Sequence, residues 1–385
     1  MNYIELDQKY IANTYKRADV VLVEGTSSTA TDIDGKKYID FTSGIGVNSL
    51  GFSDPNWAKA VADQAQKMQH ISNLYYTTPC IELAEKLCTM TGFEKVFFGN
   101  SGAEANEGAI KIARKYSFEK YGEGRYKVLS LQNSFHGRTI TTLKATGQEY
   151  FHNYFFPFTE GFDYAPAHDA DATIEMLKVG GFCAVMVEVV QGEGGVIALS
   201  KDYVNAVYDY CKANDILFIV DEVQTGIGRT GTMLAHEQFG IKPDVVTLAK
   251  GLGGGLPIGA FLLAESTKDV FKYSDHGTTF GGNPVVCAGA KVVLESLDLA
   301  EITKKGEYFR AKLEAIEEVE SVTGLGMMIG IKPKTKEVGA ILGECLANGL
   351  IVLSAKDKVR LLPPLNISYA EIDAGLEILA SVLNK

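Results

Sequence analysis

The chain has 385 residues, of which 46% are hydrophobic and 22% are charged, as in soluble globular proteins. Its length exceeds the size at which one hydrophobic core stops growing, so we expect more than one domain. The formal net charge of −11 and the pI near 5.2 argue against a nucleic-acid-binding surface, which needs a basic stripe. The six cysteines include no C-x-x-C pair, which favours a reducing compartment and no metal site.

The N-terminal part of the sequence contains no apolar signal core, and no run of about eighteen apolar residues occurs anywhere. We therefore expect a cytoplasmic protein that does not enter a membrane. The first twenty residues are polar with scattered aromatic residues, and we expect them to pack across another surface. Residues 21–41 predict short strands around a turn that ends in Asp34-Gly35, and a helix is expected over residues 55–69.

From about residue 80 the pattern alternates between short apolar strands and amphipathic helices. Ser101 with Glu104 predicts a capped helix start, and residues 203–213 predict another helix. The expected strands cover residues 95–98, 128–131, 183–190, 216–220 and 245–249. Such strands, separated by helices, indicate a largely parallel sheet that is covered on both faces. A smaller α/β region is expected after a helix that begins at Asn283-Pro284.

The strand at residues 245–249 ends on Lys250, which is followed by a run of glycines. Open α/β sheets bind ligands at the carboxyl ends of their strands. A partly desolvated amine at such a place has a lowered pKa and can form a Schiff base with an aldehyde. The ordinary alternative is a surface lysine at the start of a loop.

Two backbone N–H groups at a helix start and one carboxylate at a strand end fit one ligand together with Lys250. The N–H groups of Gly102 and Ala103, after the cap Ser101, can bind a phosphate. Asp221 can pair with a protonated ring nitrogen, because a buried carboxylate needs a partner. These groups predict pyridoxal phosphate (PLP), a flat phosphorylated aldehyde with a basic ring nitrogen. A structural cap and a structural salt bridge are the competing interpretations for Ser101 and Asp221.

Other side chains near these strand ends are candidates for the rest of the ligand. Gln224 can reach the ring hydroxyl, and Val223 and Phe135 can cover opposite faces of the ring. Glu222 is included among the cofactor-binding candidates. Arg138 and Arg360 are candidates for substrate carboxylates, because guanidinium groups bind carboxylates in a bidentate way. Surface arginines are the alternative.

The motifs together resemble the class III aminotransferases, in order and from about residue 10 to the C-terminus. The residues that carry the resemblance lie at 99–106, 135–139, 191–195, 221–231, 249–251 and 277–284. Two departures are Val189 after Glu188, where many members have proline, and Phe52, where many have histidine. Neither lies among the catalytic candidates, although both leave the fine specificity less defined.

The resemblance implies the fold-type-I architecture of PLP-dependent transferases. In this α/β fold a large domain has a mostly parallel seven-stranded sheet covered by helices, and the two chain ends build a smaller domain. The expected division is 1–50 as an N-terminal part of the small domain, 51–282 as the large PLP-binding domain and 283–385 as the C-terminal small domain. The resemblance also implies a homodimer with active sites at the interface.

The resemblance further implies a role for individual residues. Lys250 would bond to the cofactor aldehyde, Asp221 would pair with the pyridine nitrogen, and Thr279 would reach the phosphate from the neighbouring subunit. Arg138 would hold the carboxylate furthest from the reacting amine, and Glu193 with Arg360 would form a switch pair. The remaining substrate-binding candidates are Tyr15 and Thr278.

Within the class, Asn13-Thr14-Tyr15, the compact length and residues 360–365 are most similar to the acetylornithine aminotransferases. These enzymes transfer the ω-amino group of N2-acetyl-L-ornithine to 2-oxoglutarate, which gives N-acetyl-L-glutamate 5-semialdehyde and L-glutamate in arginine biosynthesis. Ornithine, succinylornithine and 4-aminobutyrate aminotransferases remain alternatives, and a PLP-dependent aminomutase is a more distant one. A ligand-sensing regulatory module is disfavoured, because the sequence has no appended helix-turn-helix or basic patch.

Overall fold

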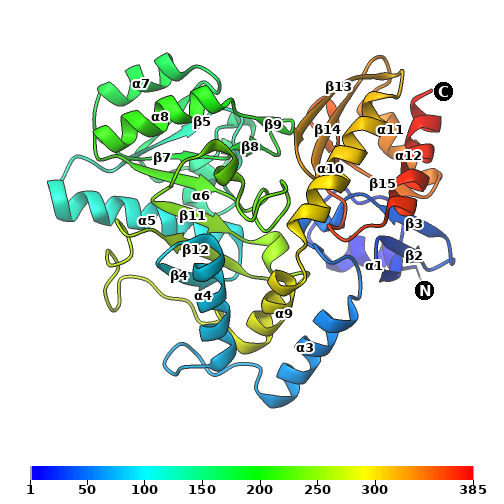
Figure 1. Ribbon diagram of the computed structural model, residues 1–385, viewed down its shortest axis with the longest axis horizontal. Coiled ribbons are helices and arrows are strands. Elements are labelled where there is room, and N and C mark those ends of the chain that lie inside the picture. The colour runs from blue at the N-terminus through cyan, green and yellow to red at the C-terminus, as the bar shows by residue number, and fades with distance from the viewer. Residues whose placement is uncertain (1, 385) are drawn as a thin grey trace.

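The computed structural model describes residues 2–384, which form a larger and a smaller lobe (Figure 1). The large lobe is built on a seven-stranded sheet. Its strands, in spatial order, are β4 (Lys95–Gly99), β12 (Gly259–Leu263), β11 (Val245–Leu248), β10 (Leu217–Asp221), β7 (Phe182–Val187), β5 (Lys127–Leu131) and β6 (Phe162–Ala165). All neighbours are parallel except β12, which is antiparallel to both β4 and β11. The mostly parallel seven-stranded sheet expected from the sequence is therefore confirmed.

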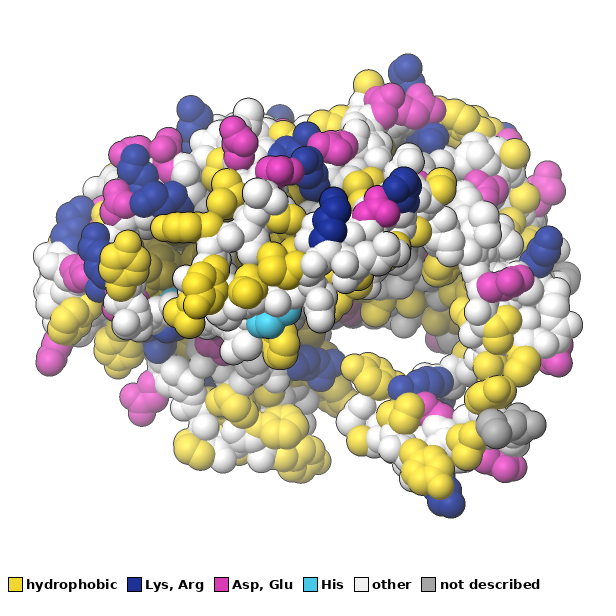
Figure 2. Space-filling model, turned by 90° about the horizontal axis from the view of Figure 1, so that it is seen from below, with side chains coloured by type: hydrophobic (Ala, Val, Ile, Leu, Met, Phe, Trp, Pro, Cys, Tyr) yellow, Lys and Arg dark blue, Asp and Glu magenta, His cyan; other side chains and the backbone are white. Residues whose placement is uncertain are grey.

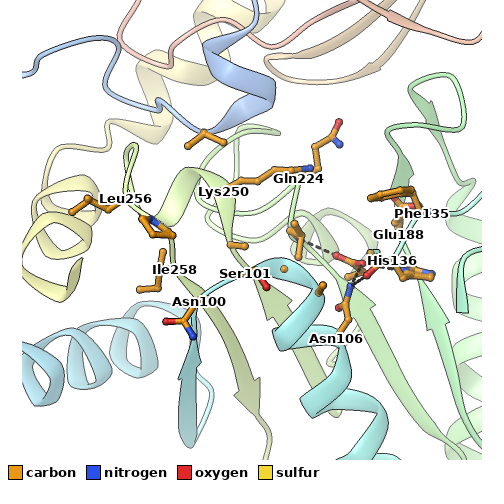
Figure 3. Close-up of a pocket in the computed structure, with 18 of the residues that line it drawn as sticks. Asn100, Ser101, Asn106, Phe135, His136, Glu188, Gln224, Lys250, Leu256 and Ile258 are labelled. Carbon is orange, nitrogen blue, oxygen red and sulfur yellow. Dashed lines mark hydrogen bonds and ion pairs between the residues drawn. The ribbon is translucent and has the colours of Figure 1, made fainter. Parts of the chain in front are cut away.

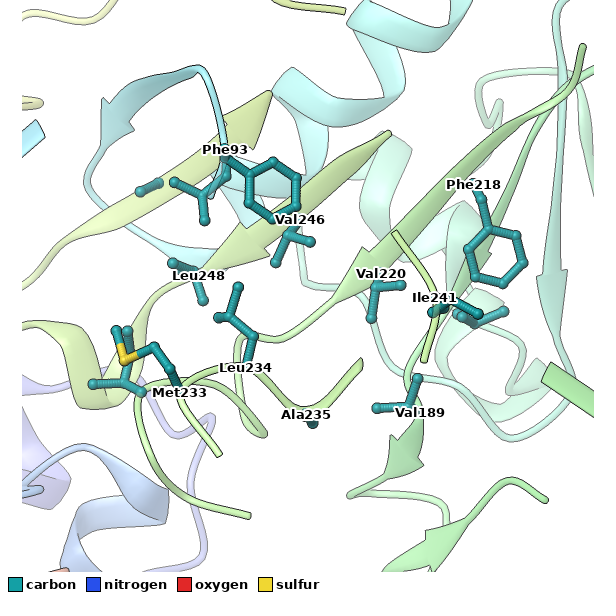
Figure 4. Close-up of a cluster of buried hydrophobic side chains, with 14 of the residues drawn as sticks. Phe93, Val189, Phe218, Val220, Met233, Leu234, Ala235, Ile241, Val246 and Leu248 are labelled. Atoms are coloured by element: carbon teal, nitrogen blue, oxygen red, sulfur yellow. The ribbon is translucent and has the colours of Figure 1, made fainter. Parts of the chain in front are cut away.

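Helices cover both faces of this sheet. Alternate side chains of each strand point to opposite sides, so each strand contributes to a core on either face. Leu217 and Ile219 of β10 pack in one core with α5 (Gly102–Tyr121). Phe218 and Val220 of the same strand pack in the other core, part of which Figure 4 shows. The helices on this second face include α4 (Thr78–Thr91), α8 (Lys201–Ala213) and α9 (Pro284–Glu295). The other large-lobe elements are α3 (Pro55–Lys67), α6 (Ile140–Ala145), η1 (Glu149–His152), α7 (Ala170–Lys178), β8 (Val190–Gln191), β9 (Ile197–Ala198), η2 (Ala235–Phe239) and η3 (Lys250–Leu252).

The small lobe holds both ends of the described chain (Figure 1). One sheet joins β1 (Leu22–Thr26), β2 (Thr29–Asp32) and β3 (Lys37–Asp40) to β15 (Leu350–Ile351), so segments from the two chain ends pair directly. A second sheet has the order β13 (Val319–Leu325), β14 (Met328–Pro333), β17 (Lys358–Leu361) and β16 (Leu353–Ala355). The helices of this lobe are α1 (Tyr3–Tyr10), α2 (Ser43–Gly46), α10 (Leu299–Glu314), α11 (Val338–Ala347) and α12 (Tyr369–Leu383).

The packing bears on the expected domain boundaries at residues 50 and 282. Phe41 shares a core with α10 and α12, which accords with an N-terminal contribution to the small lobe. The buried side chains of α9, among them Val286 and Val293, belong to the core of the large lobe. We therefore propose that the second boundary follows α9 instead of preceding it.

Arg229 holds the small lobe against the large one near the site described below. Its side chain is buried, and it donates hydrogen bonds to the carbonyl groups of Met327 and Pro363 and to Ser43 Oγ. Burial lowers the pKa of this guanidinium to about 9, while Asp40 opposes the shift. These contacts fix the end of β17, which carries Arg360, in relation to the large sheet.

Most of the elements expected from the sequence are present, with a few differences. The helix start at Asn283-Pro284 is confirmed, and the last helix, α12, begins with a capping box of Ser368 and Glu371. The strand expected over residues 183–190 ends at Val187, because the next residue, Glu188, turns its carboxylate onto the N–H groups of Phe135 and Gly192. The polar N-terminal stretch contains α1, which has no buried residue. None of the helices within residues 2–384 has the length and apolar character needed to cross a membrane.

Candidate active site

A cavity of about 360 Å³ lies where the carboxyl ends of the sheet strands meet the start of α5 (Figure 3). Lys250, Asp221 and Gly102, predicted from separate parts of the sequence, all line it. The remaining lining residues come from the end of α2, the first turns of α5, the loops that follow the strands and the segment before β12. They are Val47, Asn100, Ser101, Ala103, Asn106, Phe135, His136, Gly137, Glu188, Val223, Gln224, Ala249, Gly255, Leu256, Pro257 and Ile258. The sheet therefore brings the three key groups to one ligand-sized space.

Lys250 reaches the cavity because β11 ends at Leu248 and the chain turns sharply after Ala249. The backbone of Lys250 has a φ of 42°, which is uncommon for a residue with a side chain and places it in a strained turn. Burial lowers the pKa of its amine, Glu193 opposes this shift, and Arg360 adds to it. A desolvated amine of this kind is more often neutral and is a better nucleophile and base than an exposed lysine.

Asp221 is the last residue of β10 and is fixed by three hydrogen bonds. Its Oδ2 accepts from Asn106 Nδ2 at 2.7 Å and lies 2.8 Å from His136 Nδ1, while Oδ1 accepts from the Val223 N–H at 3.0 Å. Only 4% of Asp221 is exposed, so its carboxylate cannot turn toward water. Burial lowers the pKa of His136, but the Asp221 carboxylate more than offsets this, and the net shift is upward.

The start of α5 forms one end of the cavity. Ser101 is the N-cap, and its Oγ accepts a hydrogen bond from the Glu104 N–H at 3.2 Å. The Glu104 carboxylate accepts from the Asn100 N–H instead of the Ser101 N–H, so only half of the expected capping box forms. The N–H groups of Gly102 and Ala103 belong to the first turn, where donors have no partner within the helix and the dipole favours an anion.

Glycine is required at position 102 because the side chain of Val223 packs closely against the start of α5. A Cβ atom at this position would lie 2.7 Å from Cγ1 of Val223 and 2.9 Å from Cγ2. Such contacts are too short for carbon atoms, so a side chain here would displace Val223. The start of α5 therefore packs directly against Val223, which leaves the first-turn N–H groups uncovered by any side chain at position 102.

Arg360 of β17 and Glu193 do not line the cavity, but Arg360 lies next to it, where it contacts Glu193 and the lining residue Gln224 of the large lobe. Its Nη1 lies 2.7 Å from Glu193 Oε1 and donates to Gln224 Oε1 at 3.3 Å. Arg360 is 3% exposed, and its Nε has no hydrogen-bond partner among residues 2–384. The two charged residues are 167 positions apart in the sequence, so only the fold brings them together.

Comparison with known proteins gives this site its context. The family model described as aminotransferase class-III matches residues 10–383. The chain belongs to the class III aminotransferases. It is 52% identical over 385 residues to the acetylornithine aminotransferase of Haemophilus ducreyi, covering 99% of this chain and 98% of that one. The acetylornithine aminotransferase of Caldanaerobacter subterraneus subsp. tengcongensis is 46% identical, with 99% of each chain covered.

Solved structures of aminotransferases share the fold of the chain. An ornithine aminotransferase from Toxoplasma gondii superposes with a TM-score of 0.94 and 30% identity, covering 99% of this chain and 94% of that one. The N-acetylornithine aminotransferase from Stenotrophomonas maltophilia gives a TM-score of 0.85 and 34% identity, with 99% and 98% covered. The fold-type-I class inferred from the sequence is thereby confirmed.

As a class III aminotransferase, the protein is a PLP-dependent transaminase. The residues of its cavity fit that cofactor on their own geometry. The fixed, buried carboxylate of Asp221 suits the ring nitrogen, and the helix start at Gly102, where no side chain covers the N–H groups, suits the phosphate. The desolvated amine of Lys250 lines the same cavity.

Several of the candidate residues lie away from this cavity within the single chain. The carboxylate of Glu222 accepts hydrogen bonds from the N–H groups of Ala235 and His236 at 2.6 and 2.9 Å, so it anchors that loop instead of facing the cavity. Thr279 and Tyr15 are exposed and line two other hollows. Thr278 Oγ1 accepts from Asn100 Nδ2 at 3.1 Å, next to the cavity wall.

Three polar residues at the site had no role assigned from the sequence: His136, Asn106 and Glu188. His136 and Asn106 hold Asp221 in place. Burial raises the pKa of Glu188 to about 7, and the carboxylate binds the N–H group of Phe135 at 2.9 Å. The available signal was their position: two follow strands that end at the site, and Asn106 lies one helical turn after Gly102.

Proposed function

We propose that the enzyme transfers the ω-amino group of N2-acetyl-L-ornithine to 2-oxoglutarate, giving N-acetyl-L-glutamate 5-semialdehyde and L-glutamate. We assign this reaction to arginine biosynthesis in the cytoplasm. The names and high identities of the relatives support this substrate. The structural observation that carries the proposal is the ion pair between Arg360 and Glu193 beside Lys250.

The two half-reactions impose different charge requirements on one site. Acetylornithine has a single carboxylate, which lies far from the reacting amine, whereas glutamate has a second carboxylate next to the reacting carbon. A bare Arg360 would be unpaired during the first half-reaction, and an unpaired buried charge is costly. Glu193 neutralises Arg360 for acetylornithine and moves away for glutamate. Its side chain is 31% exposed, so it has solvent-facing room for that movement.

Arg138 is suited to the distal carboxylate that both substrates share. It lies in the loop after β5, its side chain is exposed, and it forms no ion pair or hydrogen bond with any of residues 2–384. Its guanidinium donors are therefore available for a bidentate interaction with a carboxylate. Arg138 and Arg360 then recognise the two ends of glutamate, and Arg138 alone recognises acetylornithine.

The residues of the chain divide the chemistry among them. Bound PLP supplies an aldehyde that captures the substrate amine and a ring that accepts electrons. The helix start at Gly102 and Ala103 would hold the phosphate, and Phe135 and Val223 would cover the ring. Asp221, held by His136 and Asn106, keeps the ring nitrogen protonated. The Lys250 amine, with its lowered pKa, removes the proton from Cδ of acetylornithine as a general base.

We also propose a homodimer, in which Thr279 of one subunit reaches the phosphate site of the other. The exposed position of Thr279 supports this, because within one chain it does not line the cavity. Large exposed hydrophobic side chains also support it, among them Leu74, Tyr75, Tyr76 and Phe280, and Tyr75 and Tyr76 line the same hollow as Thr279. Hydrophobic side chains are visible on the face of the molecule that is seen from below (Figure 2). Tyr15 and Thr278 are assigned to substrate binding in this assembly.

A comparison of four amines tests the proposed substrate. The purified enzyme receives acetylornithine, ornithine, succinylornithine or 4-aminobutyrate, with 2-oxoglutarate as the acceptor, and kcat/KM is measured for each. We expect the highest value for acetylornithine. A higher value for any of the other three amines would replace acetylornithine as the substrate while leaving the aminotransferase assignment intact.

A further inference from the structure

Arg138 is supported by an aromatic ring that lies outside the cavity lining. The guanidinium carbon of Arg138 is 4.3 Å from the ring centroid of Phe151 and 5.5 Å from that of Phe135. A guanidinium that lies over an aromatic face keeps the N–H donors on its edge free. Phe151 thus holds the arginine through its face without using the donors that bind a carboxylate.

The ring of Phe151 is itself held in place. It belongs to η1, and His152 Nε2 in the same turn lies 3.0 and 2.8 Å from the carbonyl oxygens of Leu143 and Thr146, which ties η1 to α6. The Phe151 ring meets the Phe135 ring edge-on, with centroids 5.8 Å apart and an interplanar angle of 71°. This packing restricts the ring, so the support under Arg138 is rigid.

We propose that Phe151 is a positioning residue that presents Arg138 to the distal carboxylate of the substrate. This inference rests on the proposed function, because it assumes that Arg138 binds that carboxylate. A free arginine side chain loses much conformational freedom when it binds a ligand, and a stacked one has lost part of it already. The ring therefore strengthens binding without touching the substrate.

Phe151 also links the carboxylate anchor to the cofactor site. It contacts both Arg138 and Phe135, and Phe135 lines the cavity that Lys250 and Asp221 share. Two rings in edge-on contact therefore connect the carboxylate anchor to the cofactor site. Loss of the ring should weaken the binding of substrates that carry a distal carboxylate. It should leave the reaction of amines without a carboxylate unchanged.

The test compares the holoenzyme with Phe151→Leu, which keeps an apolar side chain and removes the aromatic face. Phe151→Tyr restores the face, and Phe155→Leu removes an aromatic ring from the same segment that has no contact with Arg138. The amine half-reaction is followed in single turnovers with acetylornithine and with 1,4-diaminobutane, which has no carboxylate. Calorimetry gives the dissociation constant of glutarate for each holoenzyme.

We expect Phe151→Leu to lower kcat/KM for acetylornithine by about three- to thirty-fold, mainly through KM. The dissociation constant of glutarate should rise by a similar factor. The rate with 1,4-diaminobutane should not change, Phe151→Tyr should behave like the wild type, and Phe155→Leu should leave both amines unaffected. An equal loss for both amines, or no loss for acetylornithine, overturns the inference.

Arg138→Ala separates this inference from the proposed function. A large loss for acetylornithine in Arg138→Ala together with an unchanged Phe151→Leu overturns the role of Phe151 alone. An Arg138→Ala enzyme that handles acetylornithine normally refutes the carboxylate anchor, and with it that part of the proposed function.

Discussion

Replacing Glu193 by alanine is expected to impair the half-reaction with acetylornithine without impairing the half-reaction with glutamate. Arg360 is 3% exposed and would keep only the 3.3 Å contact with Gln224 Oε1. Removing one partner of a fully buried pair costs about 3–5 kcal/mol. Because the Glu193 side chain is 31% exposed, solvent reduces this effect, and we expect about 1–2 kcal/mol.

That energy appears as a change in preference between substrates. With acetylornithine the variant leaves Arg360 unpaired, so the reaction becomes less favourable. With glutamate the substrate no longer has to displace Glu193, so the reaction is unchanged or improved. The ratio of kcat/KM for acetylornithine to that for glutamate should fall by about five- to thirty-fold.

Single-turnover absorbance measurements of each half-reaction give this ratio directly. Glu175→Ala, which removes an exposed carboxylate from α7 that pairs with Lys178, controls for the change in net charge. If Glu193→Ala changed both half-reactions by the same factor, the charge argument would be refuted, and Glu193 would be only a loop residue.

Three further predictions concern the cavity. Gly102→Ala should weaken PLP binding at least about tenfold, because the added Cβ would clash with Val223. A titration of the cofactor-free protein measures this affinity, and an unaltered value would contradict the close packing. His136→Asn should shift the pH midpoint of the bound-cofactor absorbance, because Asp221 loses a hydrogen-bond partner; an identical titration would show that His136 is only a core residue. Glu188 keeps its proton up to about pH 7 when folded but only to about pH 4.5 when unfolded, so its contribution to stability falls as the pH rises through that interval. Glu188→Gln should therefore flatten the decline in the melting temperature of the cofactor-free protein between about pH 5 and pH 7, and parallel curves would contradict this.

The position of the main chemical groups followed from the sequence because parallel strands end at one edge of a sheet. Asp221 and Lys250 each come at or directly after such an end, and a glycine-containing helix start marked Gly102. Strand ends and helix starts depend on a few neighbouring residues, so periodicity and capping residues were enough to locate them in the sequence. The order of the strands and the antiparallel direction of β12 were not local and were found only in the structure.

Side-chain direction at a strand end was not predictable in the same way. Asp221 and Glu222 are neighbours, but one faces the cavity and the other binds the loop at residues 235–236. The contact of His136 with Asp221 spans 85 residues and depends on the packing of two loops. Tyr15 and Thr279 do not line the cavity of one chain, so the roles proposed for them rest on the resemblance and on a second subunit.

We propose that Lys250, Asp221 and the start of α5 bind one molecule of PLP. Borohydride reduction of the yellow holoenzyme, followed by peptide mass mapping, tests it most directly. We expect one reduced cofactor per chain, attached to the peptide that contains Lys250, and no label after Lys250→Ala. A label on another lysine, or full labelling of the Lys250→Ala protein, would contradict the account.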